Sequence, residues 1–377
     1  MAMPPLPPPP IPLRQRLLLS SDFDDTLVGN RADPRHSAGS AAFAAAFTRL
    51  RHPGCGTPAR LAINTGRTLP LFAGHPDAEL RLEALGLRPD VLIAGVGTRV
   101  YWRRGRGRGR REGGGAEAHE ARGGEEAGGG AEERAPPPPP LLLRARAPRD
   151  DGTGGQGEEE RGGRGPRWVE DAAWTAAVGE GWDARAARRA VEDALASRPG
   201  GMAAARFQRD EELHAHKLTV SFEGGRGAAD AFRAAVVERF AATGASREPP
   251  RLVAGPTASS GGRRWYADVL PRAAGKGNAL RFVAGAMRYG ADEIASAGDS
   301  HNDECMLALF DQRRAIVVGN AHAELRASLG RLPHVWCAPE DCVGAAAVLR
   351  GLACAGGGGE GWVEAAALDG AGGGGDG

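Results

Sequence analysis

Lysine is almost absent from this chain of 377 residues. Lysine and arginine together number 48, but the only lysines are Lys217 and Lys276. Positive surface charge is therefore carried by arginine. This replacement of lysine by arginine, together with the 58 glycines, indicates a biased coding composition. Under such a bias we expect lysine to persist where a compact, strongly hydrated ammonium cannot be replaced by a planar guanidinium. Both lysines are therefore candidate functional residues.

Cysteine, net charge and long hydrophobic runs are also scarce. The five cysteines show no metal-type spacing and their number is odd, which argues against a disulfide framework, so we expect a reducing, cytoplasmic compartment. The net charge of +1 argues against a surface built to bind nucleic acid or a membrane. No run is long enough to span a bilayer. The proline-rich residues 1–13 lack a signal-peptide pattern, and an organelle transit peptide is left open.

Six short apolar runs mark the expected strands of the main domain. Each is continuous and is followed by a glycine or polar turn and then by a helical pattern: residues 17–20, 61–63, 91–94, 294–297, 316–318 and 335–337. Continuous apolar runs are typical of strands buried on both faces, so they predict an α/β fold with a doubly wound, Rossmann-like parallel sheet. Ligands bind beyond the carboxyl ends of such strands, where Asp22, Thr65 and Asp299 lie.

A different pattern between residues 167 and 262 predicts a second, α+β domain. Its helical patterns lie near residues 170–177, 184–197 and 228–241. Between them, residues 216–222 alternate, with His216 on the apolar face and Lys217 on the polar face. Such alternation is typical of a half-buried antiparallel strand. We therefore expect a cap domain, residues 167–262, inserted into the α/β core.

Two low-complexity segments leave residues 14–102 and 263–352 as the two parts of the core. Residues 103–166 combine Arg–Gly alternation, Glu–Gly tracts and a proline run, and residues 353–377 are glycine-rich. Neither can bury enough apolar area to offset its ordering entropy, so both are predicted to be disordered. An arginine–glycine box that binds RNA is the alternative for residues 104–111. The composition bias also explains the arginines and glycines of this segment, and we expect no nucleic-acid partner.

Acidic residues cluster after two of the predicted strands. Residues 22–26 read Asp-Phe-Asp-Asp-Thr, and residues 298–303 read Gly-Asp-Ser-His-Asn-Asp. Carboxylates gathered at strand ends would repel one another unless a hard divalent cation lay among them, and Mg²⁺ prefers carboxylate oxygens. Lys276, at the start of a predicted helix, completes a site suited to a doubly charged phosphoryl group.

The first acidic block suggests two separate tasks. Asp22 is the candidate nucleophile, since a carboxylate can attack phosphorus to give an acyl-phosphate that water later cleaves. Asp24 is placed to protonate the leaving oxygen and then to take a proton from water. Because side chains alternate in an extended segment, the chain must turn just after Asp22. A polar turn that caps a helix is the alternative interpretation of residues 22–26 taken alone.

Further residues are candidate phosphate ligands. Thr65 and Gly66 offer a hydroxyl and backbone N–H groups at a helix entrance, although an ordinary N-cap would look the same. Lys276 would neutralise phosphate charge and restrain Asp22.

Metal ligands are expected in the second acidic block. Asp299 should contact Mg²⁺ directly, whereas Asp303, Asn302 and Ser300 would hold water ligands or orient the direct ligands. The His214–His216 pair could suggest zinc, but no third ligand lies nearby and packed histidines are the simpler interpretation.

Taken together, these blocks closely resemble the haloacid-dehalogenase-like phosphatases, and within them the sucrose-6-phosphate phosphatase branch. The superfamily blocks are Asp22–Thr26, Asn64–Arg67, Asp268–Pro271 with Gly275–Gly277, and Gly298–Asp303. The marks of the branch are Ser20, Pro89-Asp90, Val96–Thr98, His216-Lys217, Asn320-Ala321, Glu324-Leu325, Cys342 and Gly344. The resemblance covers roughly residues 14–102 and 167–352.

This resemblance implies a fold, a cofactor and roles for residues. It implies a haloacid-dehalogenase core with an inserted cap, phosphorylation of Asp22 and acid–base catalysis by Asp24. Mg²⁺ would be held by Asp22, Asp299 and the Asp24 carbonyl, with Asp303 also a candidate ligand. The cap would supply sugar contacts, and Lys217, Asp268 and His216 match those positions.

The expected activity is therefore Mg²⁺-dependent hydrolysis of a sugar phosphate, with sucrose 6-phosphate as the first candidate. Glucosyl- or mannosyl-phosphoglycerate phosphatase is the nearest alternative, and phosphomannomutase a more distant one. A silent phosphatase-like domain that binds a sucrose-synthesising enzyme is the non-enzymatic alternative. A monomer is expected.

Overall fold

The structure is a computed structural model, and it describes residues 16–29, 34–51, 59–73, 78–104, 168–256, 263–309 and 314–355. Nearly all of the predicted low-complexity insertion and of the glycine-rich tail lies outside these residues, so neither prediction of disorder is tested. The tail was expected from residue 353, but helix α10 (Gly344–Ala355) continues to Ala355. Among the described residues, no helix is both long and apolar enough to cross a bilayer.

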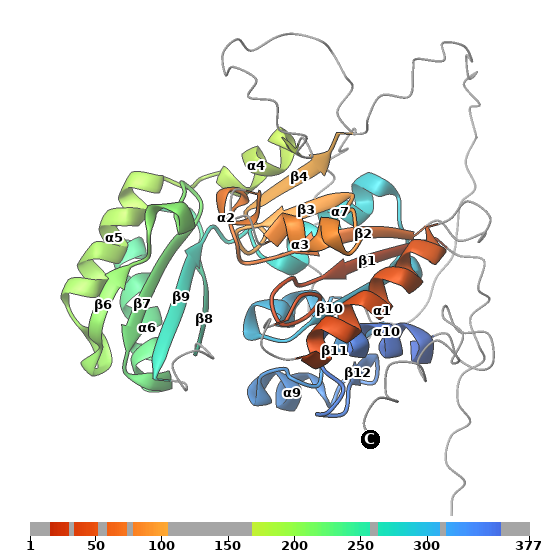
Figure 1. Cartoon of the computed structure of the whole chain (residues 1–377). Coiled ribbons are helices and arrows are strands. Elements are labelled where there is room, and N and C mark those ends of the chain that lie inside the picture. The colour runs from red at the N-terminus through yellow and green to blue at the C-terminus, as the bar shows by residue number, and fades with distance from the viewer. Residues whose placement is uncertain are drawn as a thin grey trace, which may run out of the picture.

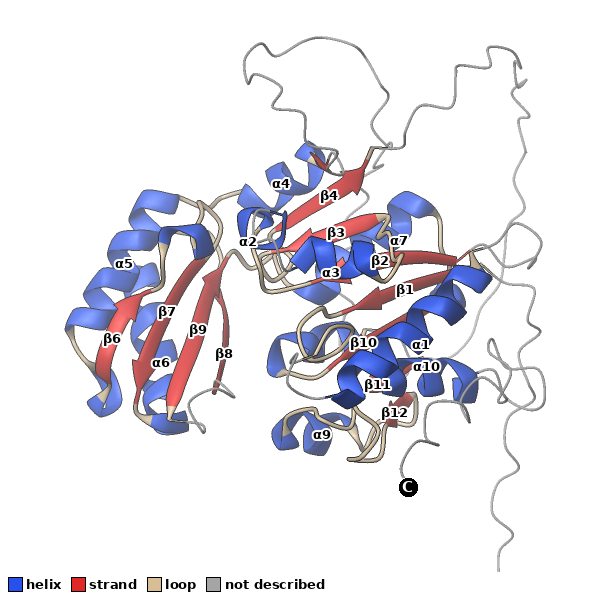
Figure 2. Cartoon of the chain, viewed as in Figure 1, coloured by secondary structure: helices blue, strands red, loops and turns tan. Residues whose placement is uncertain are grey.

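The core is an eight-stranded sheet with the order β12-β11-β10-β1-β2-β3-β4-β5 (Figures 1 and 2). All six predicted strands form its parallel part: β1 (Leu17–Ser21), β2 (Ala59–Asn64), β3 (Val91–Ala94), β10 (Ile294–Gly298), β11 (Ala315–Val317) and β12 (Val335–Cys337). Two antiparallel strands that were not predicted, β4 (Arg99–Arg103) and β5 (Trp168–Glu170), extend one edge. The strand order reverses direction at the β1/β10 pair, which is where such sheets bind ligands.

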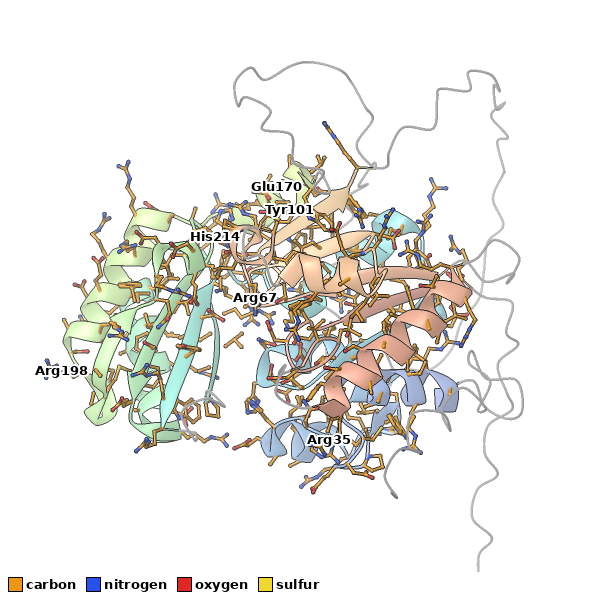
Figure 3. All side chains as sticks on the ribbon, in the orientation of Figure 1. Arg35, Arg67, Tyr101, Glu170, Arg198 and His214 are labelled. Atoms are coloured by element: carbon orange, nitrogen blue, oxygen red, sulfur yellow. The ribbon has the colours of Figure 1, made fainter. Side chains whose placement is uncertain are left out.

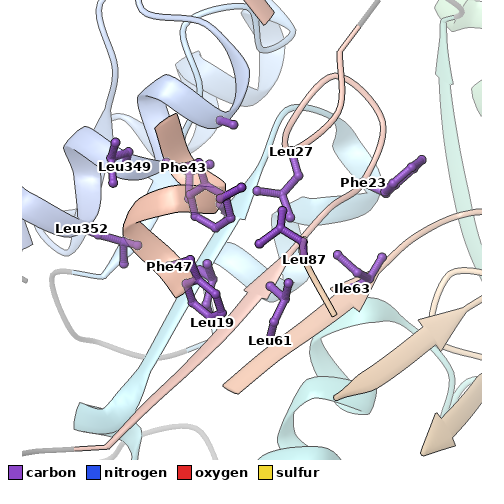
Figure 4. Close-up of a cluster of buried hydrophobic side chains, with 14 of the residues drawn as sticks. Leu19, Phe23, Leu27, Phe43, Phe47, Leu61, Ile63, Leu87, Leu349 and Leu352 are labelled. Carbon is purple, nitrogen blue, oxygen red and sulfur yellow. The ribbon is translucent and has the colours of Figure 1, made fainter. Parts of the chain in front are cut away.

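Helices cover both faces of this sheet, which confirms the doubly wound α/β class. On one face α1 (Pro34–Leu50) and α10 pack against each other and against Leu19 of β1, and Figure 4 shows Phe43 and Phe47 of α1 meeting this strand. On the other face α7 (Lys276–Met287) packs on Leu18. Leu18 and Leu19 point to opposite faces because side chains alternate along a strand, so a continuous apolar run serves both layers. Short helices complete the core: α2 (Leu69–Ala73), α3 (Ala78–Ala84), α8 (Glu304–Leu307) and α9 (Ala323–Leu329).

The cap is an antiparallel sheet of four strands backed by two helices. Its order is β6-β7-β9-β8, with β6 (Ala203–Phe207), β7 (Leu218–Glu223), β8 (Arg251–Pro256) and β9 (Arg264–Leu270). Helices α5 (Ala184–Ala196) and α6 (Gly225–Thr243) pack on one face, where Val220 and Phe222 of β7 are fully buried. The Asp183 carboxylate caps α5 by accepting from the backbone N–H groups of Arg185 and Ala186.

The polar face of β7 differs from the prediction of a half-buried strand. The strand begins at Leu218 rather than at His216, and Thr219 and Ser221 on its polar face are buried as well. This polar face therefore does not lie open to water: Lys217 and Thr219 line a cleft that the core closes from the other side.

Both predicted boundaries of the cap move in the structure. Strand β5 pairs with β4 in the core sheet, and helix α4 (Ala172–Gly179) packs on the core through Trp174, whose ring lies 5.0 Å from that of Phe282. The cap thus begins after α4 and not at residue 167. Strand β9 pairs with β7 in the cap sheet, so the core resumes after Leu270 and not at residue 263. Apolar side chains decide both cases, because Trp174 joins the core cluster while Ala267 and Val269 join the cap cluster.

Candidate active site

The chain turns immediately after β1, as Asp22 and Asp24 require. Asp25 takes a left-handed backbone conformation with φ of 55°, which aspartate tolerates better than most residues. The Val28 N–H donates to the Phe23 carbonyl at 2.9 Å and closes the loop. Within this loop the Thr26 hydroxyl donates to an Asp299 carboxylate oxygen at 3.1 Å. The turn therefore ties the first acidic block to the second, 273 residues away.

Lys276 lies at the centre of the site. It is the first residue of α7 and is fully buried. Its Nζ donates to Asp22 Oδ1 at 2.5 Å and to Asp303 Oδ1 at 2.6 Å. The Asn64 side-chain amide holds the Lys276 carbonyl at 3.1 Å. One of the two lysines of the chain thus bridges both acidic blocks.

The loop after β10 is organised around Asp303. Its Oδ2 accepts the backbone N–H groups of Asp299 at 3.1 Å and Ser300 at 3.0 Å, while Oδ1 accepts from Lys276. The Ser300 hydroxyl lies 3.1 Å from Asn302 Oδ1 and 3.2 Å from Asp303 Oδ2. A Cβ on Gly298 would come within 2.5 Å of Asp303, so only glycine permits this close approach. These contacts orient Asp303 and leave the Asp299 carboxylate facing Asp22.

The three buried carboxylates of Asp22, Asp299 and Asp303 form a group that fits a divalent cation. One oxygen from each lies within 4.8 Å of the others. Burial raises the pKa of Asp22 to about 7 despite Lys276, and it raises the pKa of Asp299 well above its usual range, with Asp22 adding to this increase. For Lys276, burial opposes the charge, but Asp22 and Asp303 outweigh it and raise its pKa. Ionisation of all three acids would leave excess negative charge beside one ammonium, which a divalent cation would offset, and their hard oxygen donors suit Mg²⁺.

Asp24 is held by an arginine that the sequence analysis did not single out. Arg67, which follows β2, makes two hydrogen bonds to the Asp24 carboxylate, from Nε at 2.8 Å and Nη2 at 2.7 Å. Figure 3 shows Arg67 where the core faces the cap. Its guanidinium also lies 5.6 Å from the Phe23 ring centroid. The Asp24 side chain is about half exposed, so it can be reached from the cleft while its orientation is fixed.

The two predicted phosphate ligands after β2 lie in different environments. Thr65 is fully buried, and its hydroxyl accepts the Arg67 N–H at 3.1 Å in the manner of a turn or cap. Gly66 lines the cleft beside the acidic cluster. In this structure Gly66, and not the Thr65 side chain, forms part of the cleft wall.

A cleft of about 600 Å³ separates the acidic cluster from the cap sheet. On the cap side Lys217 Nζ lies 3.5 Å from Asp268 Oδ1 and donates to the Glu212 carbonyl at 3.2 Å. The Thr219 hydroxyl donates to Asp268 at 2.6 Å. Charged and hydroxyl groups therefore line the cap wall opposite Asp22, as a ligand rich in hydroxyl groups requires.

His216 does not line this cleft, which corrects its prediction as a sugar contact. It precedes β7, and its ring is directed at Gly179, where a Cβ would lie 2.8 Å from His216 Nε2. Its neighbour His214 lies at the junction of core and cap (Figure 3), with Nε2 2.9 Å from the Thr98 hydroxyl. Burial lowers the pKa of His214 to about 3, so this histidine is neutral. The two rings pack edge to face, and no third ligand among the described residues joins them.

Several further residues of the cleft were not predicted. Besides Arg67, they include Arg209, Tyr266, His301 and His322. Arg67 and His301 belong to the recognised blocks, but the sequence pattern assigned no role to either of them. Tyr266 and His322 lie beside recognised blocks, and Arg209 is one of many arginines in this chain.

Three comparisons place this chain among known proteins. Residues 15–110 and 163–354 match the sequence profile of the family described as sucrose-6F-phosphate phosphohydrolase. A mannosylfructose-phosphate phosphatase of Agrobacterium fabrum is 47% identical over 58 residues, which is 15% of this chain and 23% of that relative's length. The sucrose-phosphatase of Synechocystis sp. PCC6803, solved with sucrose and phosphate, superposes with a TM-score of 0.52 at 19% identity. That superposition covers 90% of this chain and 98% of the other, and it confirms the fold.

Proposed function

The chain belongs to the sucrose-6F-phosphate phosphohydrolase family of phosphoric monoester hydrolases, and we propose that it releases phosphate from sucrose 6-phosphate by way of Asp22. One observation carries this proposal. Lys276 holds Asp22 and Asp303 at 2.5 and 2.6 Å while Asp299 completes a buried group of three carboxylates at the strand ends. Such an arrangement is suited to a phosphoryl group and a divalent cation.

Asp22 is the nucleophile in this proposal. Its hydrogen bond to Lys276 fixes the direction of Oδ1 and leaves the second oxygen available to attack phosphorus, which gives an aspartyl phosphate and the free sugar. Lys276 and the Gly66 backbone would counter the charge of the transferred phosphoryl group. Thr65 stays a candidate ligand only if its buried hydroxyl becomes accessible when substrate binds.

Asp24 is the acid and base. It would give a proton to the leaving sugar oxygen and then take one from the water that cleaves the aspartyl phosphate. Arg67 donates to both Asp24 oxygens, at 2.7 and 2.8 Å, and so orients the side chain for both proton transfers.

Mg²⁺ is the proposed cofactor. The carboxylates of Asp22 and Asp299 and the backbone carbonyl of Asp24 would hold it, and bound there it would supply positive charge to the phosphoryl oxygens. Asp303 accepts hydrogen bonds from Lys276 and from two backbone N–H groups. Together with Asn302 and Ser300 it would therefore orient the metal ligands and would not bind the ion directly.

The cap would recognise the sugar. Lys217, Asp268 and Thr219 present charged and hydroxyl groups to the cleft, and they are proposed to bind sugar hydroxyls. Closure of the cap over the core would exclude water during the first step.

A second substrate is favoured by one specific observation. The match to a mannosylfructose-phosphate phosphatase makes mannosylfructose phosphate the second candidate. A screen of phosphate release with Mg²⁺ over both disaccharide phosphates and over glucosyl- and mannosyl-phosphoglycerate decides among these substrates. The Asp22→Asn variant controls for contaminating phosphatases, because it should release none.

The same screen tests the remaining alternatives. Steady release of inorganic phosphate excludes a mutase, which would return phosphate to the sugar. Sugar-phosphate binding without turnover in excess Mg²⁺ would instead favour a silent domain that serves a sucrose-synthesising partner. We also propose that the protein is a monomer and that it acts in the cytoplasm.

A further inference from the structure

Asn320 follows β11 and has no task in the proposed mechanism. Its loop lies beside the loop after β10, since the His322 N–H donates to the Asp299 carbonyl at 2.8 Å. The Asn320 side-chain amide makes two hydrogen bonds to backbone groups that are distant in the sequence. Nδ2 donates to the Asp25 carbonyl at 2.7 Å, and Oδ1 accepts the Gly344 N–H at 2.8 Å. Asn320 therefore joins the turn after β1 to the start of helix α10.

Asp25 is the residue of this turn that most needs support. Its φ of 55° lies in the left-handed region, which costs free energy for a residue with a side chain. The Asp25 N–H donates to the Val28 carbonyl at 3.0 Å, and the Asp25 carbonyl accepts from Asn320. Two hydrogen bonds of its backbone thus oppose rotation of Asp25 to a conformation of lower energy. Loss of the Asn320 amide would remove one of them.

The conformation of Asp25 decides where the Asp24 carbonyl points. The Asp24 C=O and the Asp25 N–H belong to one planar trans peptide, so they point in opposite directions. Because the N–H points to Val28, the carbonyl points away from Val28. The proposed Mg²⁺ site uses this carbonyl together with Asp22 and Asp299. A change of φ at Asp25 would turn the peptide relative to the rest of the turn and move the carbonyl out of that site.

The other end of the Asn320 side chain contacts a part of the core that lies directly against this turn. Gly344 is the first residue of α10, which packs on α1, and a Cβ on Gly344 would lie 3.5 Å from the Thr26 carbonyl oxygen. The Gly319 N–H donates to the Cys342 carbonyl at 2.9 Å, and a Cβ on Gly319 would overlap that oxygen. The loop of Asn320 therefore lies on the segment before α10. A short side chain at this position can reach both the turn and the helix.

A side-chain amide serves both contacts at once. The Asp25 carbonyl needs a donor and the Gly344 N–H needs an acceptor, and asparagine carries one of each on a single planar group. Aspartate has the same shape but no donor when ionised, so it would keep the bond to Gly344 and place a carboxylate against the Asp25 carbonyl. Alanine would lose both bonds without adding a charge. These two substitutions therefore separate the bond to the turn from the bond to α10.

We propose that Asn320 is a positioning residue, which holds Asp25 in its left-handed conformation and so keeps the Asp24 carbonyl directed into the metal site. This inference rests on the proposed Mg²⁺ site. Removal of a group that orients a metal ligand typically lowers metal affinity about 10- to 100-fold. Asn320 acts through the backbone, so Asn320→Asp and Asn320→Ala should each raise the Kd for Mg²⁺ about tenfold, or about 1.4 kcal/mol. The KM for the sugar phosphate should stay within about twofold, because the cap supplies those contacts.

Arg326→Met is the matched control. Arg326 also makes two hydrogen bonds to backbone carbonyls, to Val318 at 3.1 Å and to Ala338 at 2.8 Å. These bonds join the residues that follow β11 and β12, and they do not involve the turn after β1. The control therefore loosens the same part of the core as the Asn320 variants, but it should leave the Kd for Mg²⁺ unchanged.

Calorimetric titration with Mg²⁺ measures the Kd of each variant, and urea denaturation shows that each is folded under the same conditions. The expected result is a Kd about tenfold higher in both Asn320 variants and unchanged in Arg326→Met. A wild-type Kd in either Asn320 variant would overturn the proposal. An equal increase in all three variants would also overturn it, because the effect would then come from a loosened core.

Hydrogen exchange of the metal-free protein separates this inference from the proposed function. The N–H groups of Asp25 and Val28 are bonded to carbonyls within the turn, and both lie in the peptide of residues 22–28. They should exchange about tenfold faster in the Asn320 variants than in wild type, and at the wild-type rate in Arg326→Met. If wild type binds no Mg²⁺, the proposed metal site fails, and the exchange rates still decide whether Asn320 holds the turn. Equal rates in wild type and the Asn320 variants reject the inference.

Discussion

The Lys276→Met substitution should reveal how much repulsion the acidic cluster contains. Lys276 is fully buried and is the only cation within hydrogen-bonding distance of Asp22 and Asp303 among the described residues. Removing one partner of a buried ion pair typically costs about 3–5 kcal/mol, because the remaining charge stays buried and uncompensated. We expect the free energy of unfolding without metal to fall by about this amount. Lys217→Met is the matched control.

Lys217 differs from Lys276 in the length of its contacts with acidic groups. Lys217 is also buried, but its contacts are longer, at 3.5 Å to Asp268 and 3.2 Å to the Glu212 carbonyl, and Asp268 keeps its hydrogen bond from Thr219. Its loss should therefore cost only about 1–2 kcal/mol.

Urea denaturation with chelator and with saturating Mg²⁺ measures both effects. Binding to the native state adds RT ln(1 + [L]/Kd) to stability, or about 2.7 kcal/mol at a hundredfold excess over Kd. Mg²⁺ should stabilise Lys276→Met more than wild type, because the variant leaves more negative charge uncompensated. If the two lysine variants lose equal stability, or Mg²⁺ stabilises Lys276→Met no more than wild type, the interpretation of this cluster as a cation and phosphoryl site is refuted.

Three other predictions concern residues around the cluster. Arg67→Gln should lower kcat about 10- to 100-fold, because Asp24 loses the group that orients it, whereas Arg60→Gln, which removes a similar bond to the remote Asp90, should leave kcat unchanged in steady-state assays. His214 is neutral when folded, with a pKa lowered to about 3, so its contribution to stability is present above its unfolded pKa of 6.5 and is lost as the pH falls. Between pH 7.5 and pH 5 wild type should therefore lose about 2 kcal/mol of unfolding free energy relative to His214→Asn, and equal losses in urea titrations would contradict this. Replacing residues 104–167 by Asn-Gly should give kcat within about twofold of wild type. Arg103 on β4 and Trp168 on β5 are directly paired, so a two-residue turn can join the two strands. A large loss of kcat would show that this segment shapes the site.

The parts of the fold and site that could be predicted were encoded locally. The six apolar runs were predicted to be strands because each run is continuous. The acids that follow two of these runs were predicted to lie together because the carboxyl ends of parallel strands meet at one edge of the sheet. The scarcity of lysine was informative for the same reason. Lys276 is the buried residue that bridges the two acidic blocks, and Lys217 lines the cap side of the cleft.

The features that could not be predicted depend on contacts between distant residues. Arg67 and Asp24 are 43 residues apart, and although Arg67 ends a recognised block, only the turn after β1 brings it to Asp24, so the sequence did not indicate this pairing. His216 was expected to contact sugar, but the missing side chain of Gly179 leaves a space that its ring faces instead. The cap boundaries moved because β5 and β9 find their partners in the sheet on the other side of each boundary.

Trapping the phosphorylated enzyme tests the central claim most directly. Enzyme mixed with sucrose 6-phosphate and Mg²⁺ is quenched within one turnover, reduced with borohydride and digested, and the peptide that contains residues 22–26 is sequenced. Reduction of an aspartyl phosphate at Asp22 should give homoserine at that position, and neither Asp24 nor the Asp22→Asn variant should yield any. Homoserine at another aspartate, or substrate turnover with Asp22 unmodified throughout, would contradict the account.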